Sequence, residues 1–134
     1  MAEAFKLKVI SPDRIFYEGE ATMLELNTIE GIVGIYKNHM PMTYIIAPGV
    51  MTITEPDDGK KVAALHSGFM QILQDEITVL AETVEWPDEI DENRAKEAQL
   101  RAERRLAMKD PNVNLQRAEM ALHRALTRQE VKKG

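Results

Sequence analysis

The sequence predicts a mixed fold, β then α: an N-terminal antiparallel β-sandwich or flattened barrel followed by a C-terminal antiparallel two-helix hairpin. Apolar residues alternate with period two in the first part of the chain and recur with a helical period after Pro87. Six of the seven glycines and five of the six prolines lie in residues 1–87, so turn-forming residues almost vanish where the helices are expected. We therefore expect one domain over residues 1–87 and a second, mobile one over residues 88–134.

Four segments of the first part alternate as half-buried strands do: Phe5–Ile10, Ala21–Leu26, Val50–Thr54 and Ile77–Ala81. Turn-forming residues separate the strands, at residues 11–13, 18–19, 48–49, 56–59, 67–68 and 74–75. The clearest hairpin signal is Asp58-Gly59. Many short strands about ten residues apart favour a sandwich or barrel over the parallel sheet of many enzymes.

Two helices are expected in the second part. Acidic residues 88–91 suit a helix start, and Arg94–Met108 contains no glycine, proline or β-branched residue. Residues 109–112 break the pattern, and Leu115–Arg128 is the second expected helix. The apolar stripe between them is Ala95, Ala98, Ala102, Ala118, Ala121 and Ala125, with Leu106, Leu115 and Leu122 beside it. Alanines bury little area, at about 25 cal/mol per Å², so we expect the hairpin to detach more easily than the sandwich unfolds.

Arginines form one stripe on each helix with the spacing i, i+7, i+11: Arg94, Arg101 and Arg105, then Arg117, Arg124 and Arg128. The ordinary interpretation is a solvated face joined by i,i+4 ion pairs. It fits only in part, because Glu97 can pair with Arg101, whereas Arg105, Arg124 and Arg128 have no acid three or four residues away. The stripes therefore indicate an anion from elsewhere, either a phosphate or an acidic protein surface.

Composition limits the other function classes. The chain of 134 residues has no cysteine, which excludes disulfides and thiolate chemistry, and its histidines lack the spacing of metal ligands, so no metal site is expected. No targeting signal and no apolar run of about 20 residues is found, so we expect a cytoplasmic chain that reaches a membrane only indirectly.

Several segments together resemble the epsilon subunit family of the bacterial rotary (F-type) ATP synthase, over nearly the whole chain. They are Gly31–Ile35 followed by His39–Pro41, Pro48–Val50, Ser67–Phe69, Ile77–Ala81 and Ile90–Ala95. The family fold, a flattened sandwich followed by two helices, agrees with the periodicity. The resemblance implies a non-catalytic rotor subunit of a proton-translocating ATP synthase, peripheral on the cytoplasmic face of the bacterial membrane. It implies that the subunit couples gamma to the c-ring and inhibits ATP hydrolysis when its hairpin extends.

The segment Ile90-Asp91-x-x-Arg94-Ala95 is similar to the ATP-binding signature of epsilon subunits of Bacillus type. By position, the resemblance implies no covalent cofactor but a regulatory ATP, bound by Glu85, Asp91, Arg94, Arg101, Arg124 and Arg128. Two alternatives stay open. Asp91 is equally suited to an ordinary helix N-terminal role, and Trp86 either stacks on adenine or covers the sheet edge.

Two surfaces are expected to bind partner proteins. In the extended hairpin the arginines, Arg105 and Arg117 included, are expected to face an acidic surface of the alpha and beta subunits. Residues 31–42 are the expected docking loop for gamma and the c-ring, with Gly31 and Gly34 giving backbone freedom and His39, Met40 and Met42 an adaptable apolar surface.

The docking loop also has a plainer interpretation, in which His39 is a satisfied loop histidine and both methionines belong to the core. Lys37-Asn38 replaces the Pro-Gly that family members often have before the histidine. We expect the turn to survive with Asn38 in a left-handed conformation.

Two functions of other classes are weaker. A small β-domain enzyme lacks support, because no paired carboxylates or nucleophile–base spacing is found. An arginine-rich adaptor for nucleic acid or another acidic partner is disfavoured because residues 1–87 carry 13 acidic against 6 basic residues. No nucleic-acid partner is therefore expected.

Overall fold

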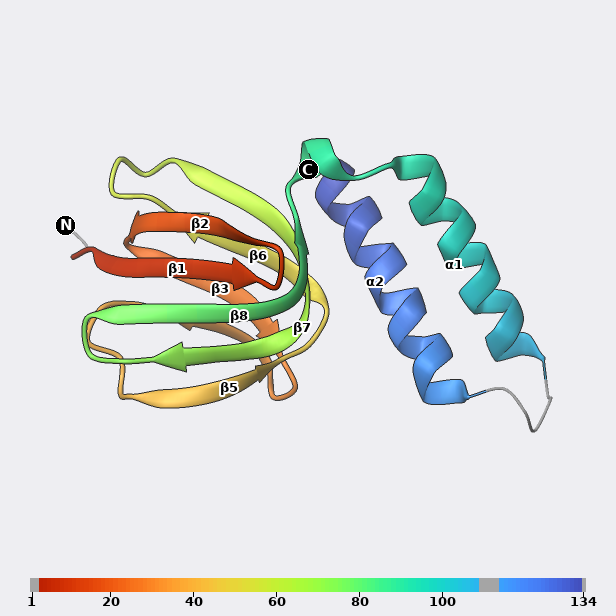
Figure 1. Ribbon diagram of the computed structural model, residues 1–134, viewed down its shortest axis with the longest axis horizontal. Coiled ribbons are helices and arrows are strands. Elements are labelled where there is room, and N and C mark those ends of the chain that lie inside the picture. The colour runs from red at the N-terminus through yellow and green to blue at the C-terminus, as the bar shows by residue number, and fades with distance from the viewer. Residues whose placement is uncertain (1–2, 109–113, 134) are drawn as a thin grey trace.

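The computed structural model describes residues 3–108 and 114–133. The elements in chain order are β1 Phe5–Ser11, β2 Arg14–Ala21, β3 Met23–Thr28, β4 Gly31–Ile35, β5 Met42–Ile46, β6 Gly49–Thr54, β7 Lys60–Ile72, β8 Glu76–Glu85, the 3-10 turn η1 Pro87–Glu89, α1 Glu92–Ala107 and α2 Leu115–Lys133. The sandwich comes first and the two antiparallel helices lie side by side beyond one end of it (Figure 1). The predicted fold class is confirmed.

The strands form one hydrogen-bonded sheet that folds over on itself (Figure 1). Its order is β2-β1-β8-β7-β5-β3-β4, with β6 joining β3 to β7. Strand β7 bridges the two layers, because its first half pairs with β6 and its second half with β5. The predicted hairpin at Asp58-Gly59 joins β6 to β7, with Asp58 at a φ of 66°.

Two of the turns expected from sequence are wrong. Glu18-Gly19 lies inside β2, an edge strand paired only with β1, where a glycine is tolerated. Ser67-Gly68 is a bend inside β7, at the point where the strand passes from β6 to β5. Both residues have positive φ, 25° and 149°. The glycine therefore marks a backbone conformation, and the chain continues instead of reversing.

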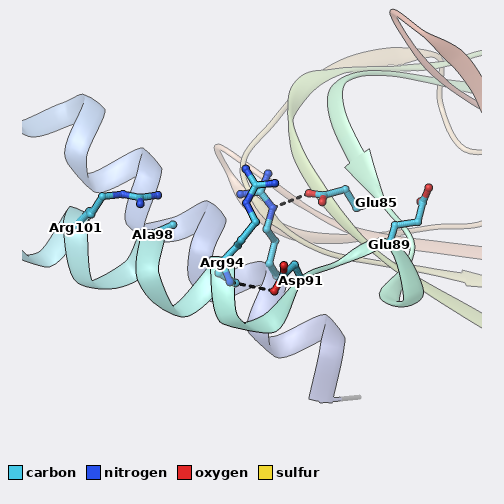
Figure 2. Close-up of a pocket in the computed structure, with 8 residues that line it drawn as sticks. Glu85, Glu89, Asp91, Arg94, Ala98 and Arg101 are labelled. Atoms are coloured by element: carbon cyan, nitrogen blue, oxygen red, sulfur yellow. Dashed lines mark hydrogen bonds and ion pairs between the residues drawn. The ribbon is translucent and has the colours of Figure 1, made fainter.

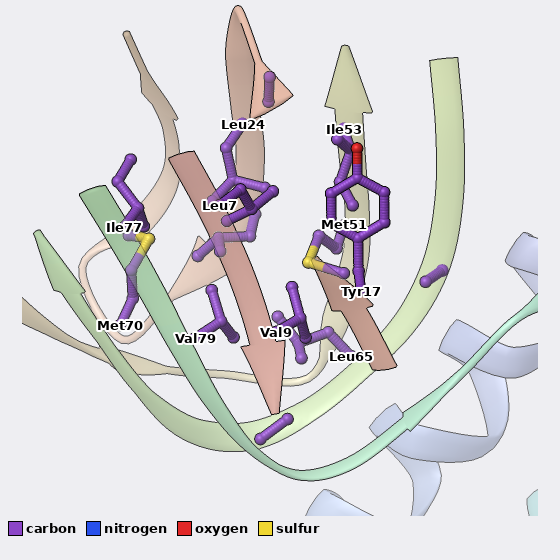
Figure 3. Packing of buried hydrophobic residues seen from close by; sticks show 14 of the residues in the cluster. Leu7, Val9, Tyr17, Leu24, Met51, Ile53, Leu65, Met70, Ile77 and Val79 are labelled. Carbon is purple, nitrogen blue, oxygen red and sulfur yellow. The ribbon is translucent and has the colours of Figure 1, made fainter. Parts of the chain in front are cut away.

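Alternate residues of the strands fill the space between the two layers (Figure 3). The largest fully buried side chains include Leu7, Leu24, Met51, Leu65 and Met70. All of them are less than 2% exposed, so the interior is closely packed. This core is what gives the sandwich a firm surface for the hairpin.

The hairpin packs on the sandwich through α2, and α1 packs mainly against α2 (Figure 1). The seam is the predicted alanine stripe, with Ala95, Ala102, Ala118 and Ala125 buried, whereas Leu115 is exposed. Helix α2 continues five residues beyond the predicted end at Arg128. The reason is tertiary, because Val131 packs with Ala64 of β7 and Ile90 of the linker in a second apolar cluster.

Candidate functional site

A cleft of about 230 Å³ lies where the hairpin meets the end of the sandwich. It is lined by side chains from β8, η1, the linker and both helices (Figure 2): Glu85, Glu89, Asp91, Arg94, Ala95, Ala98, Arg101 and Arg128. Five of the six residues implied for nucleotide binding line it. The sixth, Arg124, is half-buried one helical turn before Arg128 and does not line the cleft.

Asp91 is the N-cap of α1. Its Oδ1 accepts hydrogen bonds from the backbone N–H groups of Asn93, at 3.0 Å, and Arg94, at 3.2 Å. The local contacts of Asp91 are therefore those of an ordinary helix N-cap. The cap also fixes the first turn of α1, and in Figure 2 the Arg94 side chain extends from that turn toward the side of the cleft where Glu85 lies.

The linker before α1 is fixed to the sandwich at two points. Glu89 accepts hydrogen bonds at Oε1 from Arg14, at 2.8 Å, and from the backbone N–H of Trp86, at 2.9 Å. Trp86 stacks on Phe16 with ring centroids 4.1 Å apart. The indole is thus a cover for the sheet edge, as in the second of the two interpretations of this residue.

One ion pair crosses from the hairpin to the sandwich in the cleft. Arg128 Nε donates to Glu85 Oε1 at 2.6 Å. The close His66 ring and Arg128 together outweigh burial and lower the pKa of Glu85 to about 2. This carboxylate holds α2 with its full charge above its ordinary pKa near 4.5, and the contact weakens only as the pH falls toward about 2.

The other cleft arginines have no such partner. Within residues 3–108 and 114–133, neither Arg94 nor Arg101 forms an ion pair, and the pair between Glu97 and Arg101 that sequence allowed is not formed. The cleft carboxylates are meanwhile engaged with Arg128, Arg14 and the α1 backbone. Two cations therefore point into a cleft whose acids are already satisfied, which is the arrangement an anion needs.

Arg105 and Arg117 lie away from the cleft. Both are exposed, Arg105 near the end of α1 and Arg117 near the start of α2, at the end of the hairpin far from the linker (Figure 1). They are placed where a large partner could reach them but a ligand in the cleft could not.

The docking loop, residues 31–42, presents apolar side chains to solvent. Met40 is 74% exposed and Met42 37%, so the interpretation that both methionines belong to the core is wrong. Asn38 has a φ of 67°, which confirms the left-handed turn. His39 is half-buried, with Nδ1 2.8 Å from the Met40 carbonyl oxygen, and Gly31 and Gly34 are exposed on the edge strand β4.

A second apolar surface was missed by the sequence reasoning. Ile10, Leu80, Phe69 and Ile45 are consecutive partners across β1, β8, β7 and β5, and we call them the apolar row. Leu80, Phe69 and Ile45 are each about half exposed, at 47%, 53% and 48%. A groove of about 740 Å³ runs along the row and reaches Met120 of α2. The available signal was the run of apolar residues in β8 and β5, which leaves apolar side chains on the outer face.

In the described part of the chain, neither helix combines the length and the apolar character needed to cross a membrane.

Comparisons with known proteins agree over nearly the whole chain. A family model described as "ATP synthase, Delta/Epsilon chain, beta-sandwich domain" matches residues 4–87, and one described as "ATP synthase, Delta/Epsilon chain, long alpha-helix domain" matches residues 88–133. An ATP synthase epsilon chain of Clostridium novyi is 43% identical over 98% of this chain and 99% of its own length. One of Caldicellulosiruptor bescii is 42% identical over 96% of this chain and 92% of its own length.

Solved structures share the fold at lower identity. A chain in a structure of the Euglena gracilis mitochondrial ATP synthase, with OSCP, F1 and c-ring, has a TM-score of 0.82 and 18% identity, covering 96% of this chain and 80% of that one. A chain in a central stalk and c-ring structure of the Tetrahymena thermophila enzyme has a TM-score of 0.61 and 11% identity, covering 95% of each. These two similarities concern the fold alone.

Proposed function

Because the chain belongs to the family of ATP synthase delta/epsilon chains, we propose that it couples gamma to the c-ring and regulates hydrolysis through its helices. It is an epsilon-type, non-catalytic subunit of that complex. The proposed partners are gamma and the c-ring, with alpha and beta when the hairpin extends. They hold the chain at the cytoplasmic face of the membrane. In this proposal ATP stabilises the docked hairpin, by which we mean the arrangement of Figure 1.

The observation that carries the ATP proposal is the charge arrangement in the cleft. Arg94 and Arg101 are unpaired within the described residues and share the cleft with Arg128, while each acid there has another partner. Guanidinium groups from two helices would be joined by one phosphate chain, and such a ligand would resist separation of the hairpin from the sandwich. At about 230 Å³ the cleft is smaller than a typical ligand pocket of about 300–1,000 Å³, so the sugar and base would extend beyond it.

The movement of the hairpin is supported by how little holds it. The seam between the helices is alanine. Helix α2 contacts β6 and β7 through the small Val131 cluster and the cover over His66, and it is held further by the Glu85–Arg128 pair and a hydrogen bond from Lys132 to the Pro87 carbonyl of η1 at 3.0 Å. These interactions are few compared with the core, so undocking costs less than unfolding.

ATP titration into the isolated protein by calorimetry tests the site. We expect binding to the wild type and a loss of at least about tenfold for Arg94→Ala, since a charge-assisted contact is worth about 1.5–3 kcal/mol. Asp91→Ser keeps a capping oxygen and removes the carboxylate, so it separates ligand binding from capping in a way that Asp91→Ala cannot. Arg104→Ala, an exposed arginine of α1 outside the cleft, is the matched control and should bind as the wild type. No heat for the wild type would leave only the mechanical role.

The docking loop is expected to contact both gamma and the c-ring. Because the apolar row aligns half-exposed apolar side chains of β8, β7 and β5, we assign the main gamma contact to the row and leave the c-ring to the docking loop. Phe69→Glu places a charge in the centre of the row on a side chain that is half exposed. We expect at least about a tenfold weaker affinity for gamma, because central apolar contacts dominate interfaces, with little change in stability. Leu100→Glu, at an equally exposed leucine of α1, is the control. If both variants bind gamma equally in a pull-down titration, the apolar row is not the gamma interface.

A further inference from the structure

His66 is buried beneath the docked hairpin. Along β7, Leu65 points into the sandwich core, while the adjacent residue Ala64 packs outward against Val131 of α2. Because side chains alternate along a strand, His66 faces outward like Ala64, and it is only 1% exposed. An outward imidazole on a sheet surface is hidden only if something covers it. Helix α2 packs over β7 and brings Arg124 and Arg128 near the ring, and η1 makes a smaller contact with the same strand. The burial of His66 therefore depends on docking.

The ring has poor partners for a buried polar group. Neither Nδ1 nor Nε2 forms a hydrogen bond with the described residues, and Nε2 lies 3.4 Å from Glu85 Oε1. Among the described residues, three charged groups face it: Glu85 from β8, and Arg124 and Arg128 from α2. The same carboxylate oxygen already accepts the 2.6 Å hydrogen bond from Arg128. Glu85 is thus the acid nearest to both Arg128 and the His66 ring, and two arginines face the ring.

We propose that His66 is a proton sensor for hairpin docking, and that its protonation releases the helices from the sandwich. A protonated ring in this position is a buried cation that faces two arginines, and Glu85, the acid beside it, already pairs with Arg128. Protonation therefore weakens the docked state, because the ring, Arg124 and Arg128 would then be three cations grouped around one carboxylate in a covered site. This inference rests on the proposed movement of the hairpin and adds a proton to the signals that control it.

The direction of the pH effect follows from the neighbours. Burial and the two arginines lower the pKa of His66 in the docked state below the ordinary value near 6.5, and Glu85 only partly opposes them. Once α2 leaves, the arginines and the cover are gone and the pKa returns upward. Docking is therefore strongest above about pH 6.5 and weakens as the pH falls, by up to about tenfold for each pH unit until the docked pKa is reached.

The distance between the sandwich and the hairpin tests this inference in the full chain. The natural sequence has no cysteine, so Glu18→Cys on β2 and Glu119→Cys on α2, both exposed, give two unique sites for spin labels. We expect the docked distance at pH 8 and a growing extended population toward pH 5. His66→Gln, which cannot be protonated, should lose this response, whereas His39→Gln and His123→Gln should keep it. A wild type that stays docked throughout, or a response equal in His66→Gln, would overturn the proposal.

Two further measurements distinguish failure of this inference from failure of the proposed movement. Val131→Asp removes the apolar contact of α2 with the sandwich and should give the extended distance at pH 8. If the labels in Val131→Asp stay at the docked distance, the movement itself is wrong. Ring titration by NMR should find a lower pKa for His66 in the wild type than in Val131→Asp, and this comparison remains decisive if His66→Gln disturbs docking. Equal values would overturn the inference while leaving the movement intact.

Discussion

Reversing the charge of Arg124 and Arg128 together is expected to abolish the docked hairpin and most ATP binding, and to raise ATP hydrolysis by the reconstituted complex. Arg128→Glu sets an acid against Glu85 in place of the 2.6 Å ion pair, at a site where both side chains are mostly covered. Loss of one charge-assisted contact costs about 2 kcal/mol, or about 30-fold in affinity, before the added repulsion. Hydrolysis rises in this proposal because the same arginines face an acidic surface of beta when the helices extend.

Calorimetry measures ATP binding, and the hydrolysis rate of the reconstituted complex measures inhibition. A second double variant separates the effects on ATP binding from those on inhibition. Arg105→Glu with Arg117→Glu alters only arginines outside the cleft. It should relieve inhibition while leaving the ATP affinity of the isolated chain at the wild-type value. Unchanged hydrolysis in the Arg124 and Arg128 double variant would contradict a role for these residues against beta. An unchanged ATP affinity there would contradict the role of Arg128 in the cleft.

Helix periodicity could not identify the ion-pair partner of Arg128. Spacing along the sequence identified Arg128 as an arginine with no acid three or four residues away, and it suggested an anion from elsewhere. In the structure that anion is Glu85 of the same chain, 43 residues earlier. Such a contact depends on where α2 docks, which is a property of the packed fold. The family resemblance did include Glu85 in the candidate site, because it matches individual residues by their position in the family's motif and does not depend on periodicity.

Backbone conformation was predicted correctly at turns where a single residue type determines it. Asp58 and Asn38 both have positive φ at the expected turns, since their short polar side chains tolerate that conformation. The same logic failed at Ser67-Gly68. A glycine indicates a position that needs positive φ or a close backbone approach, but it does not indicate whether the chain reverses direction there. The long β7 strand was therefore missed, and with it the alternation that places His66 under α2 and Phe69 on the outer face.

Surface apolar residues were the other omission. Leu80 and Ile45 each follow or precede buried apolar residues, so on sequence alone they belong to continuous apolar runs. Only the register that aligns them with Phe69 turns scattered side chains into one row. Which distant strands pair, such as β1 with β8 or β5 with β7, cannot be derived from the alternation within each strand.

Gly68→Ala is expected to be the most damaging single substitution in the sandwich. Gly68 has a φ of 149°, which other residues rarely adopt, and a Cβ there would lie 2.1 Å from the carbonyl oxygen of Leu80. That atom is backbone of the neighbouring strand β8, so it cannot move aside as a flexible side chain would. Strain of about 1–3 kcal/mol adds to a clash that shifts β7 against β8, and we expect a loss of at least about 3 kcal/mol of unfolding free energy.

Thermal and urea unfolding measure this effect, with Gly34→Ala as the matched control. A Cβ at Gly34 meets the flexible end of Met23 at 3.1 Å and the Glu25 Cγ at an ordinary 3.9 Å, so that variant should unfold close to the wild type. A Gly68→Ala protein within about 0.5 kcal/mol of the wild type would mean that β7 does not need its bend. The bend carries β7 from β6 to β5, with His66 before it and Phe69 after it. A folded Gly68→Ala variant with weaker gamma binding and altered docking would therefore show that one backbone kink positions both surfaces.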